Sequence, residues 1–241
     1  MLLTAYITVV VAAGGVALWG AGAPDPTVGA LALLFWLLAN LLGEVLWLPA
    51  PQGRGYLSMA NAANFATLLL LPISEAVVIT AAAGLIADLV FRRRKWFQGL
   101  FNFAACALTV ATASIVFTRT GGSSVSIDAL LSPLNAMPLL LAGVTYFLVN
   151  TWLVAGVVAL EARLSVWHVW RTSFAFSYEL VGAVVLKLLG YLFAILFLTW
   201  GYMSAFLAVI ATYFIRDAYI RYVSQSEPPA PEVRTPDERA A

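Results

Sequence analysis

The residues of this chain that could do chemistry are polar side chains placed inside long apolar runs. Lys187 is the clearest of them, because it lies near the middle of the apolar run 174–199. A run of that length can cross a bilayer. An ionisable residue inside such a span is costly, so it faces the interior of the bundle and by default indicates a functional site. Lys187 therefore predicts a ligand cavity or an ion path.

Further polar residues interrupt other apolar runs, from the middle of the bilayer toward its inner face. Glu179 lies two helical turns before Lys187, on roughly the same helix face but too far away for a direct ion pair. The candidate ligand-binding residues come from four runs and are Lys187, Glu179, Glu44, Asn64 and Asn150. The alternative is a structural role, because such groups also hydrogen-bond one another and hold membrane helices together.

Other kinds of chemistry have little support in the sequence. There is one histidine, His168, and no cluster of His, Cys and Asp at metal-ligand spacing. No glycine-rich phosphate loop and no pattern typical of a catalytic triad occurs. A lysine in the seventh span resembles that of retinal proteins, which form a Schiff base, but the residue one turn before it is Ala183 and not a counter-ion carboxylate. The sequence predicts a protein that is not an enzyme and has no metal site, and it assigns no cofactor.

Membrane helices must position these residues, since almost nothing outside the apolar runs is left to build a soluble domain. The chain is 62% hydrophobic and 10% charged, whereas soluble domains carry about 25% charged residues. We therefore expect an all-α polytopic transmembrane helix bundle of about eight spans over residues 1–223, followed by a disordered cytoplasmic tail over residues 224–241. The eight runs are Leu2–Trp19, Val28–Leu48, Leu57–Leu71, Ile73–Phe91, Phe97–Phe117, Met137–Leu160, Phe174–Thr199 and Tyr202–Tyr222.

The third run is short and ends at a proline. Pro72 either separates two spans or bends one, because proline removes a backbone donor and clashes with the preceding helical turn. The two runs together are too long for one ordinary span. The sequence favours two helices, the first of them short.

Basic residues give the expected orientation, because lysine and arginine collect in cytoplasmic loops. If the cluster Arg92, Arg93, Arg94 and Lys95 is placed inside, alternating spans put five further arginines on the same side and only Arg119 outside; the five are Arg54, Arg163, Arg171, Arg216 and Arg221. Both termini are then cytoplasmic. The cluster also fits the attraction of anionic lipid headgroups.

Part of the chain resembles a recurring membrane region of bacterial signalling proteins. From Glu44 to Val116 the quoted features are GEVLWLPAPQGRGYLSMANAANFATLLLLP, ADLVFRRRKW and LFNFAACALTVATASIVF, and later YFLVNTWLVAGVVAL and WHVWRTSF. This region is found N-terminal to HD-GYP phosphohydrolase and diguanylate cyclase domains. Asn102 and Asn150 fall in its FN and VNT patterns. The resemblance implies a sensory or ligand-binding input in the bacterial inner membrane.

Three functions remain open at this point. The first is a sensory or ligand-binding module that acts through a partner protein, because no output domain follows in this sequence. The second is a substrate-capture component of a transporter, since the helix count and the short third span resemble the substrate-binding components of energy-coupling-factor transporters. The third is a structural or assembly subunit of a larger membrane complex. The expected partners are the lipid bilayer, another membrane or cytoplasmic protein and a small-molecule ligand; a net charge of +1 gives no reason to expect nucleic acid.

Overall fold

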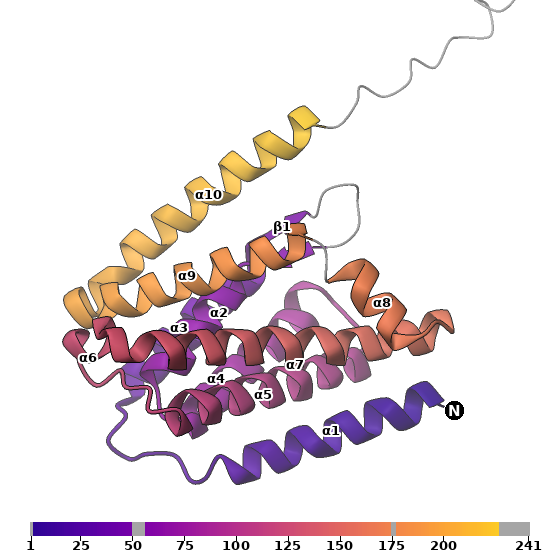
Figure 1. The fold of residues 1–241 in the computed structure, drawn as a ribbon, viewed down its shortest axis with the longest axis horizontal. Coiled ribbons are helices and arrows are strands. Elements are labelled where there is room, and N and C mark those ends of the chain that lie inside the picture. Colours follow the sequence, from indigo (N-terminus) through magenta and orange to yellow (C-terminus); the bar gives the residue numbers. More distant parts are fainter. Residues whose placement is uncertain (1, 50–55, 175–176, 227–241) are drawn as a thin grey trace, which may run out of the picture.

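The fold is a bundle of helices with one short hairpin, as Figure 1 shows. The structure is a computed structural model that describes residues 2–49, 56–174 and 177–226. Arg54 and the predicted tail from residue 227 onward lie outside the described residues. The all-α class predicted from the sequence is confirmed.

Each of the eight apolar runs forms one main helix. These are α1 (Leu2–Gly20), α2 (Ala30–Val45), α3 (Ala60–Leu70), α4 (Ile73–Ile86), α5 (Trp96–Arg119), α7 (Ala136–Ala162), α9 (Ser177–Trp200) and α10 (Ser204–Ser226). Shorter elements join them: the π-helix η2 (Ala87–Phe91), α6 (Ile127–Leu131), α8 (Val166–Ser173) and the 3-10 turns η3 (Pro133–Asn135) and η4 (Gly201–Met203).

Five helical stretches of the described chain are long and apolar enough to cross a membrane. They are Leu2–Gly20, Ile73–Phe91, Trp96–Arg119, Pro133–Ala162 and Leu180–Leu207. Helices α2 and α3 are apolar but shorter. The count of eight membrane spans therefore stays a prediction.

Pro72 separates two helices, as the sequence favoured. Helix α3 ends at Leu70, and Pro72 takes the N-cap position of α4 with extended backbone angles. With 11 residues, α3 is about 16 Å long, roughly half of the ~30 Å hydrocarbon thickness. A two-stranded antiparallel hairpin, β1 (Trp47–Pro49) and β2 (Tyr56–Ser58), precedes it.

Short as it is, α3 lies in the core of the bundle. Most of its side chains are buried, and it packs on α2, α4, α5 and α9. Polar groups are tolerated at membrane depth where protein covers them, so α3 can carry Asn64 and Thr67 there.

The remaining helices pack around α3 and α5. Helix α5 contacts α1, α4 and α7, whereas α9 packs mainly on α3 and only sparsely on α7. Helix α10 begins at the turn after α9 and diverges from α9 (Figure 1), and it also contacts β1. The N-terminus and α8 lie at one end of the bundle, and α6 lies at the other (Figure 1).

Candidate functional site

Lys187 points from α9 onto the aromatic rings of two other helices. Its Nζ lies 3.5 Å from the centroid of the Tyr146 ring on α7 and 5.5 Å from that of Phe65 on α3. The stem of the lysine passes over Gly143, where an added Cβ would lie 3.8 Å from the lysine Cγ. The ring faces stabilise the cation, because the aromatic quadrupole is negative there.

Asn64 joins this group through Tyr146. Its Nδ2 donates to the Tyr146 hydroxyl at 3.0 Å, and both side chains are buried. Among the described residues, the Asn64 Oδ1 has no hydrogen-bond partner. The hydroxyl accepts this bond and keeps a hydrogen of its own to donate. Asn64, Tyr146 and Lys187 therefore form a polar line across α3, α7 and α9.

Lys187 has no carboxylate next to it in the part of the chain that the structure describes. No salt bridge or hydrogen bond of its Nζ is found there. The contacts that hold the amine are with the two aromatic rings. This differs from Glu44, Asp88 and Arg92, which form ion pairs with one another.

A groove of about 670 Å³ lies between α7 and α9, and Lys187 lines it. Its ends are formed by Leu130 of α6 and by Trp170 of α8. The walls between them are apolar side chains such as Leu140 and Val184. Because α9 packs on α3 rather than on α7, this seam stays open. Lys187 is the one charged residue among the described residues that line the groove.

Glu44 lies in a different cluster, at the α8 end of the bundle, where α2 meets the end of α4. Its Oε2 accepts from Arg92 Nη2 at 2.6 Å, and its backbone oxygen accepts from the same nitrogen at 2.7 Å. Ser58 donates to the same carboxylate at 3.4 Å. Burial lowers the pKa of Arg92, but the carboxylates of Glu44 and Asp88 outweigh it and raise that pKa above its ordinary value.

Asp88 is the centre of this cluster. It is buried in the π-helix η2 and accepts from Arg92 Nη1 at 2.8 Å, four residues along the chain. Arg94 Nε lies 3.5 Å away, and Asn102 Nδ2 of α5 donates at 2.5 Å. The cluster fixes the ends of α2, α4 and α5 relative to one another.

The structure therefore divides the predicted ligand-binding residues. Asn64 and Lys187 meet through Tyr146, whereas Glu44 is paired with Arg92. Asn150 is half-buried one turn after Tyr146, and no partner for its side chain is found among the described residues. Glu179 lies in α9, but its side chain lies outside the described part.

The basic cluster is also divided. Arg92 turns inward to its two carboxylates, whereas Arg93, Arg94 and Lys95 are exposed. A contact of these three with lipid headgroups stays a prediction. Within the described residues, no group of three or more His, Cys, Asp or Glu is placed to hold a metal ion.

Sequence reasoning missed Tyr146 and Phe65. Tyrosine and phenylalanine are common in apolar runs, so their type gives little signal. The one available sign is spacing: Tyr146 precedes Asn150 by four residues and so shares its helix face.

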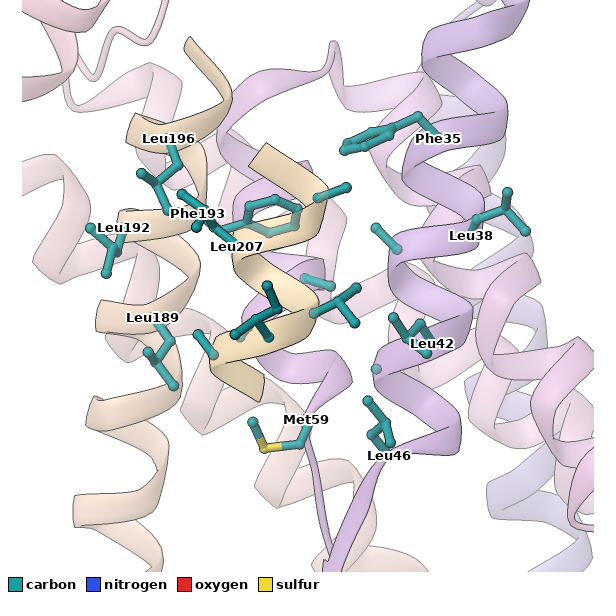
Figure 2. Close-up of a pocket in the computed structure, with 18 residues that line it drawn as sticks. Phe35, Leu38, Leu42, Leu46, Met59, Leu189, Leu192, Phe193, Leu196 and Leu207 are labelled. Atoms are coloured by element: carbon teal, nitrogen blue, oxygen red, sulfur yellow. The ribbon is translucent and has the colours of Figure 1, made fainter. Parts of the chain in front are cut away.

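A second groove, of about 520 Å³, lies between α2, α3, α9 and α10, and the described residues that line it are all apolar. Figure 2 shows its walls, with Phe35 and Leu42 of α2 facing Phe193 of α9 and Leu207 of α10. Among its described lining residues there is no polar side chain to orient a ligand. We therefore take the α7–α9 groove as the candidate site.

Fold and site together define an all-helical membrane protein with a polar group built into an otherwise apolar interior. The family model of MASE9 matches residues 59–221, which is more than half of the chain. The chain belongs to the MASE9 family of membrane-associated sensory domains. Neither the curated proteins nor the solved structures contain a match. The matched segment includes Asn64, Tyr146 and Lys187, whereas Glu44 precedes it.

Proposed function

We propose that this chain senses a small molecule inside the bilayer and that the groove between α7 and α9 is its ligand site. Lys187 is the observation that carries the proposal. A charged amine inside a membrane helix is expensive unless it is paired, and here it is held by two aromatic rings in a groove open to a ligand. A ligand acceptor at Nζ would supply the missing partner.

The other predicted residues take supporting roles in this proposal. Asn64 orients the Tyr146 ring beneath the amine. Asn150, one turn further along α7, offers a second polar contact. Glu179 is the carboxylate residue closest to Lys187 along α9. Glu44 positions the helix ends through Arg92.

We further propose that the protein lies in the bacterial inner membrane with both termini cytoplasmic. The exposed residues Arg93, Arg94 and Lys95 support this orientation, because basic residues collect on the cytoplasmic side. The signal would pass to a partner protein or domain on that side. The resemblance to membrane regions of cyclic-dinucleotide signalling proteins supports a partner of that kind.

Native mass spectrometry of the protein in lipid nanodiscs tests the ligand site. Wild-type protein is expected to carry a bound small molecule, and Lys187→Met is expected to lose it while keeping its thermal unfolding temperature. Lys95→Met is the matched control, because Lys95 is the other of two lysines in the sequence and is exposed at the start of α5. This variant should keep the ligand.

Two results would overturn the proposal. One is a bound molecule that Lys187→Met retains. The other is a wild-type protein that carries no small molecule but a stoichiometric protein subunit, which would favour a structural role in a complex.

A further inference from the structure

The groove between α7 and α9 opens toward lipid rather than toward water. Residues on its rims are exposed on the surface of the bundle, among them Leu140 and Leu188, each 60% exposed. Leu188 lies at the middle of α9 and Leu140 in the second turn of α7, both within stretches long and apolar enough to cross a membrane. A ligand would therefore enter sideways from the hydrocarbon phase and must itself be largely apolar.

The length of the groove suits a single hydrocarbon chain. Its α9 wall runs from Leu180 to Tyr191. That stretch is about 17 Å long, close to half of the ~30 Å hydrocarbon thickness and so to the depth that an acyl chain fills in one leaflet. The volume of about 670 Å³ lies in the ordinary range of ligand pockets.

The charged side chain in the groove indicates which polar group a ligand would carry. Among the described residues that line it, Lys187 is the only charged one. A phosphate carries more oxygens and more charge than one amine can satisfy, and no arginine, the residue that favours phosphate, is among the described lining residues. A carboxylate carries one charge and accepts a strong charge-assisted hydrogen bond from an ammonium group.

The position of the amine allows this contact. Side chains of a helix lean toward its N-terminus, and Lys187 leans toward Tyr146 with its Nζ over the ring. The ring covers one side of the amine, and Lys187 is among the residues that line the groove.

We propose that the ligand is an apolar monocarboxylic acid of the fatty-acid type, whose carboxylate pairs with the Lys187 ammonium while its chain fills the groove between α7 and α9. This inference rests on the proposed ligand site and names its chemistry.

Binding of a fluorescent fatty acid tests the inference. Cis-parinaric acid and its methyl ester have the same chain, but only the acid carries a charge. Each is titrated into nanodiscs that contain the whole protein, and saturable energy transfer from tryptophan is measured, since Trp170 lines the groove. Empty nanodiscs and Lys95→Met protein are the controls.

Wild-type and Lys95→Met protein are expected to bind the acid at least about tenfold more tightly than the ester, a factor that corresponds to about 1.4 kcal/mol. Lys187→Met should bind both compounds equally, and Lys187→Arg should keep the preference for the acid. If Lys187→Met does not fold, Lys187→Gln replaces it, because glutamine is polar but uncharged.

Equal binding of acid and ester by the wild type, or a preference that survives in Lys187→Met, would overturn the inference. So would the absence of saturable binding of either compound. Native mass spectrometry distinguishes a failure of this inference from a failure of the proposed function. If the wild type carries a molecule other than a fatty acid and Lys187→Met loses it, the ligand site is supported and only the fatty-acid chemistry is wrong.

Discussion

At the scale of single residues, two sets of charged side chains in the bundle have different partners. Asp88, Arg92 and Glu44 satisfy one another through short contacts. Lys187 instead meets aromatic faces. Removing one partner of a buried pair leaves an uncompensated charge, so the first group is needed for stability. An amine held by rings alone can exchange partners, which suits binding.

Asp88→Asn is expected to destabilise the protein by about 3 kcal/mol, because it removes a buried carboxylate from Arg92 and Arg94. Asp217→Asn is the matched control. Asp217 also has an arginine four residues later, but this pair is exposed, with side chains 40% and 74% accessible. It should cost no more than about 0.5 kcal/mol. Unfolding monitored by tryptophan fluorescence compares the two variants, and equal losses would contradict the distinction.

Whether a contact between two residues can be predicted from the sequence depends on how far apart they lie along the chain. The pairing of Asp88 with Arg92 joins residues four apart, a spacing that places two side chains on one helix face and can be recognised in a sequence. The pairing of Glu44 with Arg92 joins residues 48 apart and requires α2 to meet the end of α4. No local pattern in the sequence specifies that contact between α2 and α4, so the sequence alone assigns Glu44 to the same ligand site as Lys187.

At the scale of elements, the contact between α9 and α3 positions the candidate site. Gly190, one turn after Lys187, makes this approach possible, because a Cβ there would lie 2.5 Å from the backbone oxygen of Ala62 and 3.0 Å from Phe65 Cβ. The contact holds Lys187 over Phe65 and leaves the α7 side of α9 open.

Gly190→Ala is expected to push α9 away from α3 and to cost about 1–3 kcal/mol, since overpacking a closely packed contact forces backbone shifts. Gly15→Ala in α1 is the control, because an added Cβ meets no atom within 4 Å there. Alanine at that position should be neutral or stabilising by up to about 1 kcal/mol. Thermal unfolding in nanodiscs measures the stability of both variants. A Gly190→Ala variant as stable as the wild type would show that the contact between α9 and α3 can accommodate a methyl group.

The length of the apolar runs predicts the helices, because a run that crosses the bilayer must satisfy its own backbone hydrogen bonds. The break at Pro72 follows from local information too, because proline removes a backbone donor and the two runs together are too long for one span. The hairpin of β1 and β2 and the π-helix η2 were not predicted, since both depend on contacts between distant segments: the β2 end with Glu44, and Asp88 with Asn102.

At the scale of the whole molecule, the connections between helices define two ends. In Figure 1, the N-terminus and α8 lie at one end, whereas α6 lies at the other. The proposed orientation places the first end in the cytoplasm.

Labelling with a membrane-impermeant maleimide on intact cells tests this orientation. The single native cysteine is first removed as Cys106→Ala. Val125→Cys, at a position 90% exposed before α6, should react from outside. Ser165→Cys, at the exposed start of α8, should react only after permeabilisation. The reverse pattern would mean that both termini face outward.

The position of α10 has a mechanical consequence. This helix of 23 residues is about 34 Å long and leaves the bundle from a turn at Gly201, whose φ of +57° suits glycine. A rotation of about 10° at that turn would carry its far end sideways by about 6 Å, given the rise of an α-helix. Helix α9 carries Lys187 at one point and this turn at its end, so a small tilt of α9 on binding would be amplified, as by a lever arm, at Ser226.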